Sequence, residues 1–314
     1  MKISDTVYVA GHRGLAGSGI WRALEKSGFT NLVGLNSSEL DLTDRPRVFD
    51  ALAGIKPDVV IDAAARVGGI HANNTYPADF LSKNLQIQTN LMDASNAAGV
   101  DRMLFLGSSC IYPKFAKQPI NEASIMTGAL EETNDAYAIA KIAGIMQVQA
   151  SRRQHGRRWI SVMPANLYGP GDNFHPKNSH VLAALIRRFH EAVKNRASKV
   201  TVWGTGKPLR EFLFIDDLAD AVIFLLENYD SPEIINIGSG QEISIRGLAE
   251  LVASVVGFEG EIVQDLSKPD GTPRKVLDTA RLSNLGWSAE IPLEQGLALT
   301  YEWFIHNIEN LRSR

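Results

Sequence analysis

The chain has only one cysteine in its 314 residues, at position 110. One cysteine cannot form an internal disulfide, which excludes a disulfide-stabilised secreted scaffold and predicts a reducing, cytoplasmic setting. Apolar runs are also short, since none approaches the roughly 18 residues needed to cross a bilayer. The N-terminal segment lacks the apolar core of a secretory signal. These absences predict a cytoplasmic protein that has no membrane partner.

The sequence has little excess charge of either sign. Its 32 lysines and arginines nearly balance 35 aspartates and glutamates, and basic residues such as Arg187 and Arg188 occur in pairs rather than tracts. Binding to nucleic acid needs a concentrated basic surface, so nucleic acid is not an expected partner. No cluster of cysteine, histidine and carboxylate residues has metal-ligand spacing, and no metal is predicted.

What the first half of the chain does contain is an alternation of short apolar runs with helical patterns. Runs typical of strands occupy residues 6–10, 31–35, 58–65, 102–108 and 159–164, and a segment long enough for a helix separates each from the next. Short apolar strands that alternate with helices form parallel sheets covered on both faces. The predicted class is therefore α/β, with a Rossmann-type doubly wound parallel sheet.

Beyond residue 165 this rhythm changes. Residues 166–180 are rich in glycine, proline and asparagine and predict a long loop, after which shorter strand-like runs mix with helices. We expect a dinucleotide-binding Rossmann domain over 1–165, to which the chain returns around 211–238. A smaller mixed α/β lobe over 166–314 is expected to bind the substrate.

The first motif that carries chemistry is a glycine triplet. Gly11, Gly14 and Gly17 follow the first strand with the spacing GxxGxxG and open a helix. Glycines let the backbone approach a pyrophosphate, while the helix N-terminus faces its charge. At the first strand-to-helix turn of a chain that starts with βαβ, this motif predicts dinucleotide binding.

The end of the second strand indicates which dinucleotide is bound. NAD-binding proteins usually place a carboxylate there, about 20 residues past the glycines, to bind the ribose hydroxyls. This chain has Asn36, Ser37 and Ser38, with no acid before Glu39. A 2′-phosphate would not be repelled at this position, and Arg13 in the glycine turn could pair with it. We therefore expect NADP rather than NAD.

A second motif, YAIAK, places Tyr137 and Lys141 on one face of a helix. An ammonium near a phenol stabilises the phenolate and brings the phenol pKa toward the range of a general acid or base. Ser108 ends the fourth predicted strand. With the glycine motif, these three residues resemble the Ser, Tyr, Lys catalytic set of the extended short-chain dehydrogenase/reductases.

The resemblance becomes narrower when the loops are included. The chain is similar to the GDP-L-fucose synthase family in eight motifs, which occur in the order AAARVGGIHANNTYPADF, FLGSSCIYPK, YAIAKIAGI, NLYGP, DNFHPKNSHV, RRFHEA, VWGTGKPLREFL and KPDGTPRK. This resemblance covers nearly the whole chain. It implies a bifunctional epimerase/reductase that converts GDP-4-keto-6-deoxy-D-mannose to GDP-L-fucose, by epimerisation at C3 and C5 and NADPH-dependent reduction at C4.

The resemblance also implies a role for the single cysteine. Removing a proton from a carbon beside the C4 carbonyl gives an enolate, and inversion then needs a proton from the opposite face of the ring. The family assigns this acid and base pair to positions that match Cys110 and His180. Tyr137 would protonate the C4 oxygen, Ser108 would hydrogen-bond it, and Lys141 would hold the nicotinamide ribose. His175, in the loop before His180, is taken as structural.

Further binding residues are implied by position in the family's motifs. The cofactor would contact the glycine turn, the strand ends and the loops that follow them, at Gly11, Arg13, Gly14, Leu15, Gly17, Asp41, Leu42, Leu106, Gly107, Lys141, Pro164, Asn166, Leu167 and His180. The GDP moiety would contact Arg188, Trp203, Arg210 and Asp270. One departure is that the family often has basic residues where this chain has LNSS. The family also forms homodimers through two long helices, which here would be 78–99 and 137–153.

Two alternatives remain open from the sequence. A related sugar-nucleotide enzyme of the GDP-colitose type would keep the same catalytic residues and differ in the pocket near C3. A non-catalytic dinucleotide-binding sensor could use the same fold, because fold alone does not fix function. Such a sensor would be expected to lose the tyrosine, the serine or the proton-transfer pair, and all of these residues are present.

Overall fold

The computed structural model describes residues 1–176, 178–268 and 270–311. Its main element is a six-stranded, wholly parallel sheet, which confirms the predicted class. In spatial order the strands are β2 (Leu32–Val33), β1 (Val7–Ala10), β3 (Val59–Asp62), β4 (Arg102–Leu106), β5 (Arg158–Pro164) and β9 (Ile235–Ile237). Every residue of β1, β3 and β4 is buried, as expected for strands covered on both faces.

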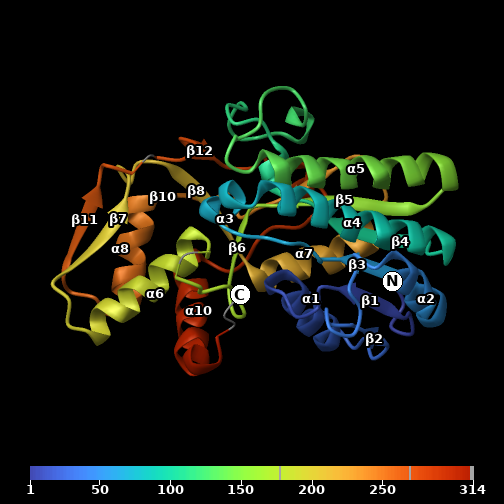
Figure 1. Cartoon of the computed structure of the whole chain (residues 1–314), viewed down its shortest axis with the longest axis horizontal. Helices are drawn as coiled ribbons and strands as arrows, with labels where there is room; N and C mark the ends of the chain where they lie inside the picture. Colours follow the sequence, from blue (N-terminus) through green and yellow to red (C-terminus); the bar gives the residue numbers. More distant parts are fainter. Residues whose placement is uncertain (177, 269, 312–314) are drawn as a thin grey trace.

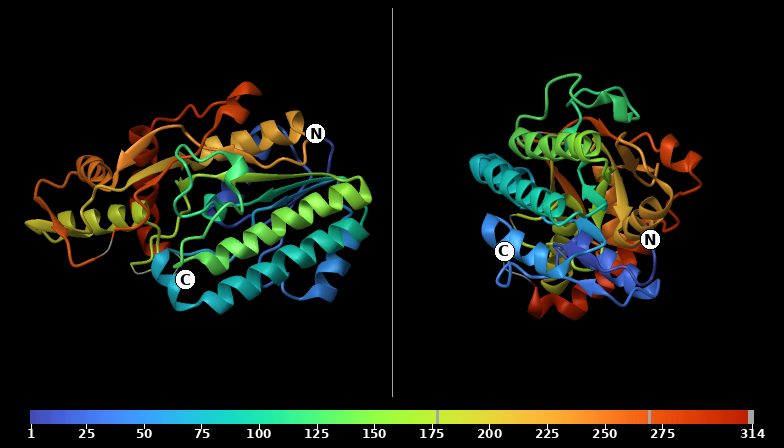
Figure 2. Two further views of the ribbon diagram at one scale, coloured as in Figure 1. Left: turned by 90° about the horizontal axis from the view of Figure 1, so that it is seen from above. Right: turned by 90° about the vertical axis from the view of Figure 1, so that its right-hand side faces the viewer.

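Helices cover this sheet on two sides (Figures 1 and 2). On one face, α4 (Pro77–Ala97) packs against both α5 (Asp135–His155) and α2 (Arg45–Ile55), and the short α3 (Ile70–Thr75) precedes α4. On the other face, α1 (Leu15–Lys26) packs against α7 (Ile215–Asn228). Each of the five predicted strands is present; four are shorter than their apolar runs, and β5 begins one residue before its predicted run.

The remaining elements form a smaller mixed group at one end of the molecule (Figure 1). Strand β8 (Leu209–Phe214) pairs with three others, namely β6 (Asn166–Tyr168), β10 (Glu242–Ser244) and β12 (Arg274–Lys275). A separate parallel pair joins β7 (Lys199–Trp203) to β11 (Glu261–Asp265). The helices here are α6 (Val181–Lys194), α8 (Ile245–Val256) and α10 (Leu293–Asn307), whereas α9 (Ala280–Asn284) lies against β9 of the large sheet.

The prediction of a loop over 166–180 is wrong for its first three residues. Residues Asn166–Tyr168 form β6, which lies parallel to Phe212–Phe214 of β8. The side chain of Asn166 also donates to the carbonyl of Glu211 at 2.7 Å. A strand partner supplied by a distant segment overrides the weak local preference of an NLY sequence. The rest of 169–180, apart from Lys177, is irregular.

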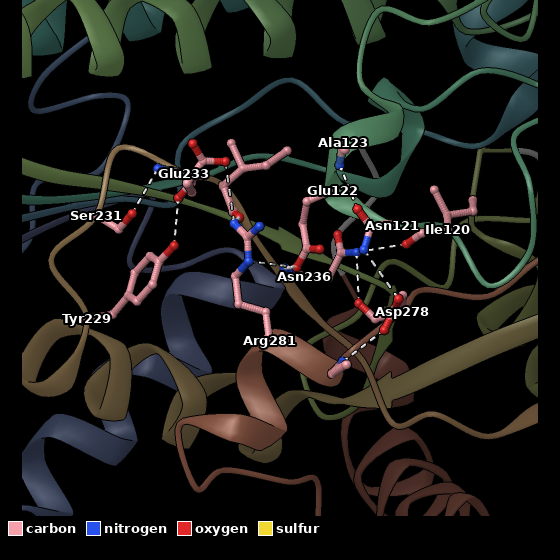
Figure 3. A network of polar contacts seen from close by, with 12 residues as sticks. Ile120, Asn121, Glu122, Ala123, Tyr229, Ser231, Glu233, Asn236, Asp278 and Arg281 are labelled. Carbon is pink, nitrogen blue, oxygen red and sulfur yellow. Dashed lines mark hydrogen bonds and ion pairs between the residues drawn. The ribbon is translucent and has the colours of Figure 1, made fainter.

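Between β4 and α5 the chain makes a long excursion, residues 112–134, that is fastened to the sheet by Asn236 of β9 (Figure 3). The fully buried Asn236 side chain donates to the carbonyls of Ile120, at 2.9 Å, and Asp278, at 3.0 Å. Its backbone N–H donates to the carboxylate of Glu122 at 3.1 Å. Because each of these groups is buried or half-buried, leaving them unpaired would be costly, and the excursion is held firmly.

The excursion also pairs with the segment that follows β12. The backbone N–H of Ile120 donates to the carbonyl of Val276 at 2.8 Å, and the N–H of Val276 donates to the side chain of Gln118 at 3.0 Å. Two segments more than 150 residues apart are therefore locked side by side. Within the described residues, no helix is long and apolar enough to span a membrane.

Candidate active site

The glycine turn has the geometry that a dinucleotide needs. Gly11 has a φ of 77°, which favours glycine, and a side chain there would lie 2.7 Å from the carbonyl oxygen of Ala63. A Cβ at Gly17 would overlap the carbonyl of Gly11. Gly14 caps α1 without a side chain, which leaves the first N–H groups of the helix accessible. These residues fit a bound pyrophosphate because a Cβ at any of them would fill or distort the turn.

The other predicted cofactor positions lie at the carboxyl ends of the sheet strands and in the loops beyond them. Leu106 ends β4 before Gly107, Pro164 ends β5, and Asn166 and Leu167 lie in β6. The Asp41–Leu42 loop beyond β2 is fixed because Asn90 of α4 donates to the carbonyl of Leu42 at 3.0 Å. Hydrogen bonds from Thr43 lower the pKa of Asp41. Arg13 is exposed in the glycine turn, and Leu15 begins α1.

Ser108 and Tyr137 meet beyond the end of β4. The Ser108 hydroxyl hydrogen-bonds Tyr137 and also accepts from the N–H of Cys110 at 3.2 Å. Burial raises the pKa of Tyr137, its electrostatic interaction with Cys110 raises it further, and the hydrogen bond from Ser108 lowers it. In this state the phenol keeps its proton at neutral pH, as a general acid must before it donates.

Lys141 lies one helical turn after Tyr137, as the YAIAK spacing predicts. Its Nζ is buried, donates to the carbonyl of Leu106 at 2.7 Å and lies 4.6 Å from the ring centroid of Phe105. Burial lowers the pKa of Lys141 to about 8, and the charge of Asp62 opposes this effect. The ammonium is thus held at the end of β4, beside Gly107 and Ser108.

Cys110 has two nitrogen donors that the sequence reasoning missed. The half-buried thiol lies 3.5 Å from Nδ2 of Asn134 and 3.5 Å from Nζ of Lys275. Asn134 immediately precedes α5, and Lys275 ends β12. An ammonium and an amide N–H directed at one sulfur stabilise negative charge on it. Lys275 belongs to the KPDGTPRK motif, but only its position in the fold assigns it to this site.

His180 is the N-cap of α6. The residue is exposed, but desolvation by the protein atoms around its ring lowers the pKa of His180. The ammonium of Lys275 lowers the same pKa further. Lys275 thus interacts with both members of the predicted proton-transfer pair. His175 accepts from the N–H of Asn178 at 3.2 Å, which is a contact within the loop.

The excursion explains why Lys275 reaches Cys110. Cys110 lies just before the excursion begins, whereas Lys275 directly precedes Val276, whose backbone pairs with Gln118 and Ile120. The fixed pairing holds the end of β12 against the segment that carries the thiol. The site therefore depends on long-range backbone pairing, for which the local sequence has no recognisable pattern.

Two of the predicted GDP-binding residues lie together on α6 and β7. Arg188 donates to the carbonyl of Thr201 at 2.6 Å, and burial lowers its pKa. Trp203 is 60% exposed, which leaves a ring face free, and Nζ of Lys268 lies 5.6 Å from its centroid. An exposed indole beside cationic groups suits a nucleobase and a diphosphate.

The other two, Arg210 and Asp270, interact electrostatically. Asp270 accepts from the backbone and hydroxyl of Thr205, at 2.9 and 2.7 Å, and these hydrogen bonds lower its pKa, the hydroxyl contributing most. Since Thr205 follows Trp203 by two residues, this contact connects the two pairs. Glu131 of the excursion pairs with Lys114 at 3.2 Å and accepts from Thr272 at 3.4 Å, so it links the excursion to the same loop.

The fold and these residues together define a dinucleotide-binding enzyme of the extended short-chain dehydrogenase/reductase type. The model of the NAD dependent epimerase/dehydratase family matches residues 7–238, and the chain belongs to this family. Over 307 residues the chain is 61% identical to GDP-L-fucose synthase 1 of Arabidopsis thaliana, covering 98% of this chain and 95% of the relative. The expected family resemblance is confirmed.

Two further comparisons bear on the substrate. GDP-L-colitose synthase of Yersinia pseudotuberculosis is 37% identical, with 97% of this chain and 99% of the relative covered. A crystal structure of a GDP-L-fucose synthetase from Naegleria fowleri bound to NADP superposes with a TM-score of 0.92 at 29% identity, covering 100% of this chain and 98% of that chain.

Proposed function

We propose that this chain converts GDP-4-keto-6-deoxy-D-mannose to GDP-L-fucose with NADPH as the cofactor. The observation that carries the proposal is the meeting of two sets of groups: Ser108, Tyr137 and Lys141 of a reductase, and Cys110 with His180 for proton transfer. The high identity to GDP-L-fucose synthase 1 of Arabidopsis thaliana supports the same conclusion.

Epimerisation requires the second set. With the C4 carbonyl of the substrate near Ser108, Cys110 and His180 exchange protons at the flanking carbons from opposite faces of the ring. Hydrogen bonding to the C4 oxygen from Ser108 and Tyr137 stabilises the enolate. Lys275 stabilises negative charge on the sulfur of Cys110 while that group lacks its proton.

Reduction requires the first set. The bound NADPH supplies a hydride to C4 of the epimerised sugar. Tyr137 donates its proton to the C4 oxygen, and Ser108 orients that oxygen by a hydrogen bond. Lys141 would bind the nicotinamide ribose and favour the phenolate that forms at Tyr137. The glycine turn would hold the pyrophosphate, and Arg13 would bind the 2′-phosphate.

GDP recognition is assigned to the smaller lobe. Arg188 and Arg210 would bind the diphosphate, Trp203 would stack on the guanine, and Asp270 would orient the nucleotide. The division into a Rossmann domain over 1–165, with a return around 211–238, and a substrate lobe over 166–314 is part of this proposal. The single cysteine further favours the cytoplasm.

We further infer a homodimer formed through α4 and α5. The outer surface of α5 exposes Ile139 and Met146, whose side chains are 48% and 45% accessible. Apolar side chains on the exposed face of two long adjacent helices are suited to a four-helix contact with a second copy.

The test is incubation with GDP-4-keto-6-deoxy-D-mannose and NADPH, followed by NMR of the product. GDP-L-fucose, with deuterium at C3 and C5 when the solvent is D2O, is the expected result. GDP-4-keto-3,6-dideoxy-D-mannose is the comparison substrate. A higher kcat/KM for this dideoxy sugar would favour the GDP-colitose alternative, and NADPH binding without turnover of either sugar would favour the non-catalytic sensor.

A further inference from the structure

Asp62 is a buried carboxylate to which neither the sequence motifs nor the proposed mechanism gives a role. It is the last residue of β3 and has no exposed surface. Its Oδ1 accepts from the backbone N–H of Ala64 at 3.2 Å. Within the described part of the chain, its Oδ2 is one of few buried side-chain oxygens without a hydrogen-bond partner. A charge buried with so little hydrogen bonding needs a compensating group nearby.

The sheet register places that group above Asp62. Asp62 pairs with Phe105 of β4, and paired residues of neighbouring parallel strands point to the same face. The Phe105 ring faces α5, because Gly144 of that helix packs directly against it. The Asp62 side chain therefore points to the α5 face, where Nζ of Lys141 lies over Phe105 and bonds the carbonyl of Leu106.

We propose that Asp62 is a positioning residue for the catalytic lysine: its buried carboxylate keeps Lys141 charged, so that the ammonium can hold the cofactor ribose and stabilise the Tyr137 phenolate. This inference rests on the proposed reductase function. It adds a group from β3 to a reductase set whose other members follow β4 or lie on α5.

Electrostatics agrees with this arrangement. Burial lowers the pKa of Lys141 to about 8, and among the charged groups Asp62 opposes that shift. Conversely, burial raises the pKa of Asp62 to about 6, and Lys141 opposes this shift. Between these values both groups are charged. The buried Tyr8 of β1 also faces Asp62, whose charge adds to the effect of burial in raising the pKa of Tyr8, so it stays neutral in this range.

The test is the pH dependence of reduction in Asp62→Asn. Asparagine keeps the shape and the acceptor for Ala64 but removes the charge. Lys141 should then lose its proton at lower pH, which moves the basic limb of the rate profile down by about one unit from its wild-type midpoint near 8. Reduction should be about fivefold slower than in the wild type at about pH 8 and nearly equal at about pH 6.

If the basic limb of the rate profile belonged to Tyr137 and not to Lys141, Asp62→Asn would shift it in the opposite direction. Loss of positive charge at Lys141 makes the phenol a weaker acid, so a basic limb that belonged to Tyr137 would move to higher pH in Asp62→Asn. A basic limb that stays in place or moves to higher pH would overturn the proposal.

The matched control is Asp172→Asn, in the loop after β6. It removes another buried carboxylate, whose pKa burial raises to about 7. It should leave the basic limb where it is.

A measurement on the intact carboxylate covers the case in which Asp62→Asn does not fold. Infrared difference spectra of the wild type should show a buried carboxyl losing its proton near pH 6. This transition should move to higher pH in Lys141→Met, because the compensating charge is gone. A transition that Lys141→Met does not move would overturn the pairing. Wild-type enzyme that makes no GDP-L-fucose would instead contradict the proposed function, while these spectra would still test the charge pair.

Discussion

At the scale of single residues, the site combines the predicted reductase residues with a thiol that has two nitrogen donors beside it. Cys110 contacts an amide N–H and an ammonium, while Tyr137, next to it, is kept protonated by burial. A group that must accept a proton and one that must donate a proton thus lie side by side.

Cys110→Ser tests the role of the thiol. Serine is nearly isosteric but far less acidic, so exchange of the C3 and C5 hydrogens with D2O should fall by at least about 100-fold. NADPH binding and the melting temperature should be unchanged. Because Ser108, Tyr137 and Lys141 are intact, the variant should reduce uninverted substrate and yield GDP-6-deoxy sugars of the D series, such as GDP-D-rhamnose. GDP-L-fucose formed at the wild-type rate would refute the catalytic assignment.

Lys275→Met tests whether the ammonium supports proton transfer. Removing a charge 3.5 Å from the sulfur should slow solvent exchange at C3 and C5 by about tenfold or more. The pKa of His180 should rise toward its ordinary value, since Lys275 contributes to lowering it. Lys275→Arg keeps the charge and is the control that should recover much of the exchange rate. GDP affinity, measured separately, distinguishes a lost phosphate contact from lost proton transfer. Exchange at the wild-type rate in Lys275→Met would argue against this role.

At the scale of elements, the glycine turn and the loop after β2 are the parts that we propose to set the cofactor preference. The loop is occupied by its own contacts: the carbonyl oxygen of the Asn36 side chain accepts from the N–H of Ser38 at 2.9 Å, and Glu39 accepts from the N–H of Asn36 at 2.8 Å. A 2′-phosphate would therefore depend on Arg13 for its positive charge.

Arg13→Ala should consequently reduce the preference for NADPH over NADH by about tenfold, the loss expected for one charge-assisted contact. The measurement is kcat/KM for each cofactor. Arg22→Ala, which removes another exposed arginine from α1 that pairs with Asp216, should leave the preference unchanged. Equal kcat/KM values for NADPH and NADH in the wild type would contradict the assignment.

The excursion is the second element with a testable role. Asn236→Ala removes two donated hydrogen bonds and the acceptor for the Tyr112 hydroxyl, all in a buried region. We expect a loss of about 2 to 4 kcal/mol in the free energy of unfolding. Because the excursion positions Val276, and therefore Lys275, solvent exchange at C3 and C5 should also slow. The control is Asn228→Ala, which removes a side-chain hydrogen bond on the exposed surface. If Asn236→Ala lowered the free energy of unfolding no more than Asn228→Ala does, the excursion would be held by other contacts.

At the scale of the whole molecule, catalysis needs groups from both lobes. Ser108 follows β4 of the larger sheet and Tyr137 lies on α5, which covers that sheet, whereas His180 and Lys275 come from α6 and β12 of the smaller group. The excursion, which includes Glu131, connects the large sheet to the smaller group of strands and helices. Under the proposed function, the sugar would bind where these groups meet, at the edge of the large sheet where a ligand site is expected in this fold.

Ile139→Glu tests the assembly of the whole molecule. A buried charge at the proposed contact between copies should weaken dimerisation, so sedimentation should show monomer at concentrations where the wild type is dimeric. Ile305→Glu is the matched control, since Ile305 of α10 is 43% exposed, close to the 48% of Ile139. A wild type that sediments as a monomer, or an unaffected Ile139→Glu variant, would exclude α5 from the interface.

The sequence by itself determined the parts that depend on local pattern. Short apolar runs predicted the strands of the parallel sheet, because strands covered on both faces must be continuously apolar. GxxGxxG and YAIAK predicted the glycine turn and the facing of Tyr137 and Lys141, since backbone freedom and helical spacing are local properties. Cys110 and His180 were chosen by resemblance to a family.

Only the tertiary structure decided how distant segments meet. It paired residues 166–168 with β8, joined β12 to the excursion so that Lys275 reaches Cys110, and placed Asp62 beneath Lys141 through the register of β3 and β4. No local signal marks Lys275, Asn134 or Asp62, because each acts through a neighbour that is far away in the chain. Electrostatic energy depends on distance and burial, and both are fixed only when the sheet, the helices and the excursion have packed together.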